Sequence, residues 1–380
     1  MVYYREYKKL ILSYMTPYLI VFFLTSLIAL MMHIKQIQTI KPILAFIVVL
    51  VLSSLHLIRD YSIGTDTIEY VYIFNDLAAF NSISDILYFS TIRGFEIGFC
   101  LLTYLLMFIF RDPHILFFIY IFMMYSILTY VFLKTKLNMV LLFGALFSYF
   151  IVYYNAFNIL RQSVAMSIII LATYFLTQGK TKRFVFLVLL SSIFFHYSSI
   201  ICLGFYFIWK FKDILYRLWF VNITAVVLIS GTVLNYITEK YVRYSTYSEK
   251  DEVTSNLSPV LFSFYLIVFL ISIVSKKLVR QDLRELFVFL SAIYSFFIGL
   301  QIFFYFNDFV NQALIRLALY FMWPVFFIVG ILLASIRDTG FRYIINTVFF
   351  LFISVFFVYA TSQKGSEVIP FVTDRLFEIF

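Results

Sequence analysis

The sequence has 380 residues, of which 63% are hydrophobic and only 13% are charged, and its formal net charge is +9. A soluble domain carries about 45–50% apolar and about 25% charged residues, so a soluble globule of this composition would lack the polar surface that it needs. The basic residues are spread over short loops, which also argues against a nucleic-acid-binding protein, because such a protein needs one contiguous basic face or tail.

Apolar runs long enough to cross a bilayer, which takes about 17–25 residues, follow one another along the chain. They lie at 10–32, 42–58, 96–110, 114–133, 138–154, 161–176, 184–209 (one long or two short pieces), 217–236, 259–275, 285–306, 314–335 and 342–360. Backbone polar groups inside a bilayer must be satisfied within each segment, which favours helices. These runs predict an all-α polytopic integral membrane protein with about 12–13 transmembrane helices, forming a single transmembrane domain over residues 1–380.

The distribution of Lys and Arg predicts the orientation, because cytoplasmic loops are enriched in them. The basic loops 179–183, 276–280 and 337–342 should be cytoplasmic. We then expect five regions on the opposite side, namely 155–161, the turn near His196, a periplasmic loop at 237–258, 306–316 and the tail from Thr361.

The segment 59–95 does not follow from counting alone. Counting back from the loop at Lys180 places this segment in the cytoplasm, whereas a cytoplasmic loop at Lys35 and Lys41 places it outside. The outside placement needs one more crossing or a re-entrant hairpin, and the stretch 68–80 is apolar enough to enter the membrane. Of these two placements we favour an external or re-entrant loop at 59–95, which the family resemblance described below supports.

The first polar cluster follows the second apolar run. Gly64 permits a tight turn, and Asp66 and Glu69 place two carboxylates three residues apart. Such a pair can abstract a proton from a hydroxyl or hold a cation. The same spacing also fits an ordinary helix start, with Thr65 or Asp66 as N-cap and Glu69 closing a capping box from Asp66. Further along the segment, Arg93 and Glu96 bracket the start of the next apolar run.

Three more polar positions interrupt or flank the later apolar runs, where charged groups are costly and therefore candidates for function. Arg161, with the neutral donors Asn158 and Gln162 beside it, can grip a phosphate through two parallel hydrogen bonds, or it can snorkel to the headgroups. Between Arg183 and Lys210, His196 is the sole residue among the Asp, Glu, Lys, Arg and His types. An isolated histidine is usually a satisfied buried residue, but an imidazole is also a natural general base for a sugar hydroxyl.

Arg316 begins a late apolar run, on the membrane side that we expect for Arg161. Two arginines at separate helix ends can stabilise the charge that builds up on a pyrophosphate leaving group. The chain contains no P-loop, GxGxxG or HExxH pattern, and Cys100 and Cys202 form no CxxC pair. These absences argue against a cytoplasmic sugar-nucleotide enzyme, and the two cysteines offer no metal-ligand spacing.

Four short patterns in order along residues 59–321 resemble a known family. Gly64-Thr65-Asp66-Thr67 with Tyr70 resembles a GTDxxxY motif; the other elements are an NxxRQxxA pattern at 158–165, an FHxSS pattern at 195–199 and an RxxxYF pattern at 316–321. Together they are similar to the EpsG-like branch of Wzy-type polysaccharide (O-antigen) polymerases. The chain departs from that family after Glu96, where Ile97 stands at a position that is commonly proline.

The resemblance implies a GT-C-like membrane enzyme at the outer, periplasmic face of the bacterial inner (cytoplasmic) membrane. Such a polymerase transfers a growing glycan from undecaprenyl pyrophosphate to a hydroxyl of a new lipid-linked repeat unit, without a metal or a nucleotide. Its partners would be this lipid-linked oligosaccharide as donor and acceptor, membrane lipid and a protein that regulates chain length. The resemblance also motivates placing the loop around Gly64 outside, beside the other motifs.

From the chemistry of this transfer we assign roles to the polar residues. These are His196, Asp66 and Glu69 in activating the hydroxyl, Arg161, Arg316 and Arg93 on the pyrophosphate, and Asn158, Gln162 and Tyr70 as polar support. The sequence leaves open a flippase of lipid-linked oligosaccharides and an O-antigen ligase, which handle the same carrier. A flippase should show internal repeats, which are not evident here, and the candidate charges lie at one rim.

Overall fold

The computed structural model describes residues 2–135, 137–147, 152–240, 259–307, 312–362 and 368–374. This part of the chain is helical, and its one β-type pairing is an isolated bridge between Arg59 and Thr373. The predicted all-α class is therefore confirmed. Of the predicted periplasmic loop at 237–258, residues 241–258 lie outside the described residues, as do 308–311 of the predicted outer region 306–316.

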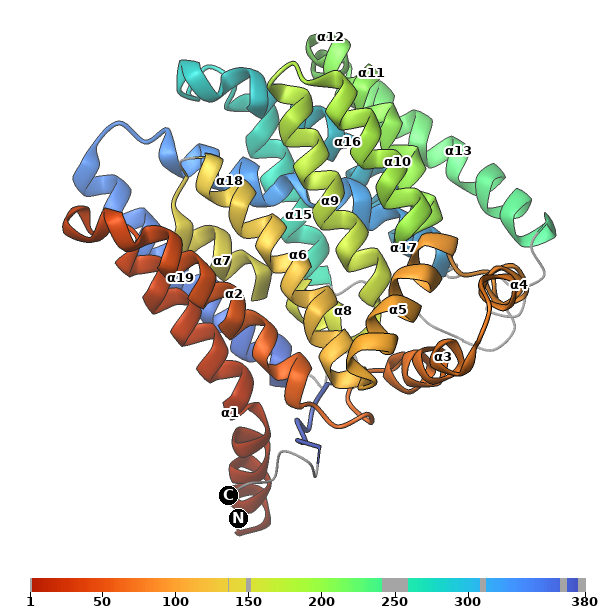
Figure 1. The fold of residues 1–380 in the computed structure, drawn as a ribbon. Coiled ribbons are helices and arrows are strands. Elements are labelled where there is room, and N and C mark those ends of the chain that lie inside the picture. The colour runs from red at the N-terminus through yellow and green to blue at the C-terminus, as the bar shows by residue number, and fades with distance from the viewer. Residues whose placement is uncertain are drawn as a thin grey trace. The chain divides into compact units, whose positions relative to one another are not determined.

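Figure 1 shows the helices in chain order. The first ten are α1 (Val2–Met31), α2 (Lys41–Ile58), α3 (Thr67–Ala79), α4 (Ile83–Arg93), α5 (Ile97–Phe110), α6 (Pro113–Thr135), α7 (Met139–Phe147), α8 (Val152–Asn158), α9 (Leu160–Thr177) and α10 (Thr181–Phe194). The others are α11 (Gly204–Lys210), α12 (Lys212–Arg217), α13 (Trp219–Lys240), α15 (Pro259–Val274), α16 (Arg284–Phe306), α17 (Gln312–Met322), α18 (Pro324–Ala334) and α19 (Thr339–Ser362). Short 3₁₀ helices occupy Lys35–Ile40, Tyr197–Leu203 and Gln281–Leu283.

Several described helical segments have the length and composition to cross a membrane, which confirms the polytopic character. Six meet both criteria, namely Gln38–Ile58, Pro113–Thr135, Leu160–Thr177, Gln281–Phe306, Leu314–Ala334 and Thr339–Tyr359. The predicted run 138–154 consists of two helices, α7 and α8, bent by 47° and counted as a seventh span if taken together. Shorter apolar helices lie at Met15–Met31, Ile97–Phe110, Trp219–Thr232 and Pro259–Val274. The count of about 12–13 crossings stays a prediction.

The chain divides into two compact units, each described here by itself. The first contains Met1–Tyr174, Lys182–Ile200 and Ile344–Phe380, and the second contains Phe175–Thr181 and Ile201–Tyr343. In the second unit α13, α15, α17 and α18 pack around α16. Gly299 on α16 allows this packing, because a Cβ there would lie 2.8 Å from Val226 on α13. The single transmembrane domain over 1–380 stays a prediction.

In the first unit, α2 packs along α1 and α6, and the segment after α2 is tied to the end of the chain. The amide of Asp60 donates to the carbonyl of Val372 at 2.9 Å, and the amide of Asp374 donates to the carbonyl of Ile58 at 3.0 Å. The beginning of the segment 59–95 and the chain end at 368–374 therefore lie on one side of any membrane that α2 crosses. The segment itself contains α3 and α4, which pack on α5; its placement outside stays a prediction.

The turn at Gly64 is a close backbone approach within the first unit. Its φ of +95° lies in the region that favours glycine, and a Cβ would lie 2.6 Å from Asn158 Oδ1 and 2.9 Å from the carbonyl oxygen of Phe157. The loop that carries the first motif is thus pressed against the residues just before Arg161.

We predict that Gly64→Ala destabilises the protein more than Gly179→Ala, as measured by thermal unfolding in nanodiscs. Both glycines have positive φ, but a Cβ at Gly179 would meet nothing within 4 Å. Gly179→Ala should therefore cost only the strain of the left-handed region, about 1–2 kcal/mol, while Gly64→Ala adds a steric clash with backbone. Equal melting temperatures for the two variants would show that the loop does not press on Phe157 and Asn158.

Candidate active site

A buried ion pair between Glu96 and Arg161 lies at the centre of the first unit's polar residues. Glu96 is the N-cap residue of α5, and Arg161 lies in the first turn of α9. Arg161 Nη1 donates to Glu96 Oε2, with the two side chains only 15% and 3% exposed. A carboxylate this inaccessible is tolerated only when it is paired and hydrogen-bonded. Arg161 therefore has a partner within the protein, which neither of the two alternatives, binding a phosphate or snorkelling to the headgroups, included.

The second oxygen of Glu96 holds the turn that carries His196. Glu96 Oε1 accepts a hydrogen bond from the amide of Tyr197 at 3.0 Å. The Tyr197 hydroxyl donates to the carbonyl of Phe95 at 3.3 Å. His196 is half-buried and its Nδ1 lies 2.6 Å from Ser198 Oγ. One carboxylate therefore joins the arginine of the second motif to the histidine of the third.

The first motif reaches the same place through Asn158. Its Oδ1 accepts from the amide of Thr65 at 2.8 Å, and the hydroxyl of Thr67 lies 3.4 Å from the carbonyl of Phe157. Predicted as a neutral donor beside a phosphate, Asn158 instead uses its amide oxygen to anchor the loop that carries Asp66. Its role in substrate binding stays a prediction.

Aromatic rings and Tyr70 enclose the guanidinium of Arg161. Its Cζ lies 4.4 Å from the ring centre of Phe95 and 5.6 Å from that of Phe99, which are favourable cation–π distances. Tyr70, on α3, is buried and forms a side-chain hydrogen bond with Arg161. Tyr70 was predicted as polar support, and the structure places it beside this arginine.

The two acidic residues of the first motif are more accessible to solvent than Glu96. Asp66 is half-buried and Glu69 is exposed. Asp66 is indeed the N-cap residue of α3, but its side chain makes no capping hydrogen bond, so the capping-box alternative is wrong. Thr65 Oγ1 donates to Asp66 Oδ1 at 3.1 Å. Gln162 is buried on α9, one residue beyond Arg161.

The remaining predicted arginines, Arg93 and Arg316, belong to other parts of the fold. Arg93 lies in the last turn of α4, 3.9 Å from Asp76, with both side chains about half exposed. Arg316 lies on α17 in the second unit and is half-buried. Their roles on a pyrophosphate stay predictions.

The sequence analysis missed three buried polar residues of the first unit, Arg59, His56 and His114. Arg59 follows α2 directly and is 0% exposed, His56 lies one turn earlier, and His114 begins α6. The two histidines interrupt or begin apolar runs, which is the signal that singled out His196. Applied evenly, that signal would have found them.

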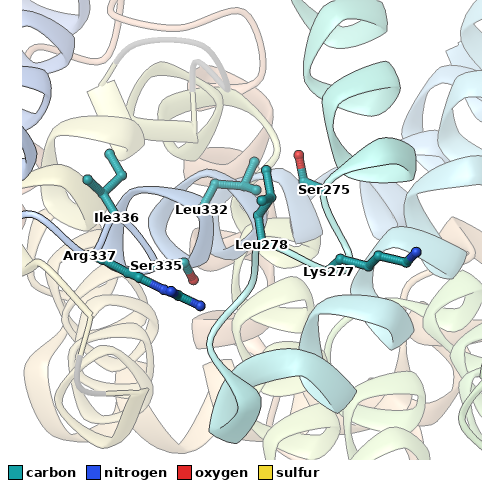
Figure 2. Close-up of a pocket in the computed structure, with 7 residues that line it drawn as sticks. All are labelled: Ser275, Lys277, Leu278, Leu332, Ser335, Ile336 and Arg337. Carbon is teal, nitrogen blue, oxygen red and sulfur yellow. The ribbon is translucent and has the colours of Figure 1, made fainter.

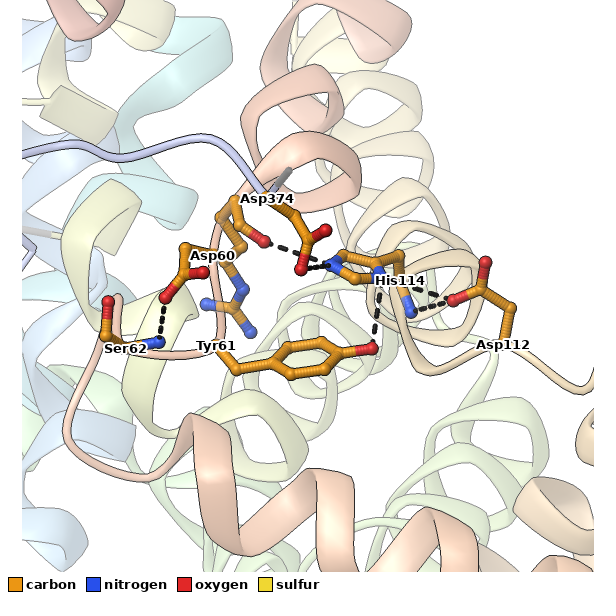
Figure 3. A network of polar contacts seen from close by, with 7 residues as sticks. Asp60, Tyr61, Ser62, Asp112, His114 and Asp374 are labelled. Atoms are coloured by element: carbon orange, nitrogen blue, oxygen red, sulfur yellow. Dashed lines mark hydrogen bonds and ion pairs between the residues drawn. The ribbon is translucent and has the colours of Figure 1, made fainter. Parts of the chain in front are cut away.

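His114 belongs to a polar network beside the end of α2 (Figure 3). Its Nε2 donates to the carbonyl of Arg59 at 3.1 Å and lies 3.5 Å from Asp374 Oδ2. Its Nδ1 lies 3.1 Å from the Tyr61 hydroxyl and 3.2 Å from Asp112 Oδ1. Burial and the neighbouring carboxylates raise the pKa of Tyr61 to about 12, so the phenol stays protonated at neutral pH. The network fastens the chain end to the start of the first motif's loop.

The second unit contains a cavity of about 500 Å³ at the ends of α15 and α18 (Figure 2). It is lined by Ser275, Lys277, Leu278, Leu332, Ser335, Ile336 and Arg337. These residues belong to or adjoin the basic loops predicted to be cytoplasmic, and none of the predicted site residues lines the cavity. It is therefore separate from the polar residues around Glu96.

Chemically, the residues joined to Glu96 offer a paired guanidinium beside aromatic rings and, next to Tyr197, an imidazole. Asp66 and Glu69, on the loop anchored at Asn158 and the start of α3, offer two carboxylates that are more accessible to solvent. Within the described residues, no group of three or more His, Cys, Asp or Glu is placed to hold a metal ion. Such an arrangement suits proton transfer and electrostatic stabilisation of a leaving group.

Comparison with protein-family models matches residues 42–373 to the EpsG family. The match covers most of the chain and includes each predicted site residue. Comparisons with curated proteins and with solved structures find no match.

We predict that replacing only one residue of the Glu96–Arg161 pair destabilises the protein far more than replacing both. Arg161→Met or Glu96→Leu alone should lower the unfolding free energy by about 3–5 kcal/mol, because each leaves a buried charge without its partner. The double variant should recover most of the lost melting temperature. Single variants that melt like wild type would contradict the pairing.

Proposed function

The chain belongs to the EpsG family, and on that premise we propose that it polymerises a lipid-linked glycan at the outer face of the bacterial inner membrane. The family supports a polysaccharide-polymerase-like function in a membrane. The finer proposal is that the growing glycan leaves undecaprenyl pyrophosphate and is joined to a hydroxyl of a new lipid-linked repeat unit.

One observation carries this proposal, namely that Glu96 hydrogen-bonds both Arg161 and the amide next to His196. Glu96 thereby joins the second and third motifs, and Tyr70 and Asn158 link the first motif to them. A general base next to a guanidinium is what transfer from a pyrophosphate requires, because a proton must leave the acceptor while negative charge builds up on the leaving group.

In the proposed step the acceptor hydroxyl oxygen attacks the anomeric carbon of the growing chain. A glycosidic C–O bond forms, the C–O bond to pyrophosphate breaks, and its electron pair goes to the pyrophosphate oxygen. In the tautomer in which His196 Nδ1–H donates to Ser198 Oγ, 2.6 Å away, His196 Nε2 carries the lone pair that accepts the hydroxyl proton. Asp66 or Glu69 orients the acceptor or takes the proton instead.

Charge on the leaving pyrophosphate would be stabilised by Arg161, Arg316 and Arg93. Arg161 is already paired with Glu96, so its contribution would come from its remaining Nε–H, which has no hydrogen-bond partner among the described residues. Gln162 and Tyr70 would support this arginine. The proposal needs no cofactor, and it includes membrane lipid and a chain-length regulator as partners.

The test is polymerisation in vitro by protein in nanodiscs with synthetic undecaprenyl-pyrophosphate repeat units and excess EDTA. We expect a ladder of lengthening products, and His196→Gln should slow its formation by about 10²–10⁴-fold, the usual contribution of general acid–base catalysis. His33→Gln is the matched control, because His33 is exposed at the end of α1.

Each other outcome contradicts a stated part of the proposal. A ladder that His196→Gln leaves unchanged would rule out His196 as the base. Movement of the lipid-linked unit across the bilayer without any ladder would indicate a flippase. Transfer of the glycan to a lipid A core acceptor instead of a repeat unit would indicate an O-antigen ligase.

A further inference from the structure

Arg59 is a buried guanidinium that the proposed reaction does not yet use. It follows α2 directly and is 0% exposed. Its Nη1 donates to the carbonyl of Phe157 at 3.0 Å. Its Cζ lies 4.2 Å from the ring centre of Phe117 and 5.1 Å from that of Phe157. Two aromatic faces therefore hold the guanidinium, and one of its three nitrogens is satisfied.

The other two nitrogens, Nε and Nη2, are buried and have no hydrogen-bond partner among the described residues. These atoms form one edge of the guanidinium, the edge that presents two parallel N–H groups to a carboxylate or phosphate. Both ring nitrogens of His56, one turn earlier, are likewise buried without a partner. The imidazole stacks on Phe157 with ring centres 3.8 Å apart.

The charge on this edge persists at neutral pH. Burial lowers the pKa of Arg59 to about 9, partly offset by Tyr18 and Tyr70. A guanidinium that remains charged, buried and without a carboxylate partner is unfavourable unless an anion completes it. The donors and the charge both indicate a missing acceptor.

Arg59 adjoins the residues around Glu96. Tyr70 interacts electrostatically with Arg59 and with Arg161. The carbonyl of Phe157, which accepts from Arg59, precedes Asn158, which anchors the loop of the first motif. An anion held by Arg59 would therefore lie close to the Phe157–Asn158 segment that anchors the loop of the first motif.

We propose that the Nε–Nη2 edge of Arg59, assisted by His56, is an anion site that takes a phosphate group of the pyrophosphate carrier. The identity of the carrier rests on the proposed function, while the phosphate chemistry rests on the unpartnered edge. Because Arg59 is fully buried in this structure, binding requires the side chains around it to move.

The experiment measures binding of inorganic pyrophosphate to full-length protein in nanodiscs, by thermal shift and by equilibrium titration in EDTA. We expect pyrophosphate to raise the melting temperature of the wild type. Arg59→Met should weaken binding at least tenfold and abolish the shift, and Arg59→Lys should recover little, because lysine keeps the charge but lacks the two-pronged edge. Arg183→Met is the matched control, since Arg183 is an exposed arginine of the same unit.

A second measurement uses the wild type alone, so that it does not depend on the folding of variants. Bound pyrophosphate should slow backbone hydrogen exchange in peptides covering 56–66 and 152–160. Unchanged exchange there, or unchanged binding in a folded Arg59→Met variant, would overturn the anion site.

Polymer synthesis measured on the same preparations separates the two proposals. Pyrophosphate binding that depends on Arg59, in a protein that makes no polymer with its cognate unit, would uphold the anion site and contradict the proposed function. Polymer formation together with binding that Arg59→Met leaves intact would uphold the function and overturn the anion site.

Discussion

The carboxylate of Glu96 is almost inaccessible to solvent, and the way its charge is compensated determines where the other polar groups lie. One oxygen pairs with Arg161 and the other accepts from the amide of Tyr197. A carboxylate buried at this depth must satisfy both oxygens, so α5, α9 and the turn after α10 are held at fixed positions relative to one another. The half-buried His196 takes its place from that arrangement.

Aromatic side chains help to stabilise the buried positive charges of Arg161 and Arg59. The chain contains 50 Phe and 30 Tyr. Phe95 and Phe99, just before and on α5, cover the guanidinium of Arg161, and Phe117 on α6 and Phe157 on α8 cover that of Arg59. Rings supply a favourable surface for a cation without supplying a hydrogen-bond acceptor. A guanidinium surrounded by rings thus remains available to an anion along any edge that no carbonyl or carboxylate occupies, which is the condition of Arg59.

The sequence predicted the fold class well, because apolar runs of spanning length have few alternatives to helices. The helix start at Asp66 was predicted as one alternative. The bend between α7 and α8 and the separate helix α4 were missed, since no periodicity marks where an apolar run breaks. In the candidate site, Arg161, His196, Asn158 and Tyr70 were named beforehand, and the structure brings them together. Glu96 received no role, because its partners are 65 and 101 residues away along the chain and local spacing carries no information at that range. Arg59 and His56 received no role either. The position of His56 inside an apolar run was a signal in the sequence, but burial without a hydrogen-bond partner is visible only in three dimensions.

The most direct test of this arrangement is residue-resolved hydrogen exchange at the amide of Tyr197. It compares the wild type with the Glu96→Leu/Arg161→Met double variant, in which no unpaired charge is left. We expect the amide to be protected in the wild type and to exchange much faster in the double variant, while amides elsewhere in α5 and α9 keep their protection. Equal exchange at Tyr197 in the two proteins would show that Glu96 does not hold the histidine turn, and the proposed assembly of the site would be wrong.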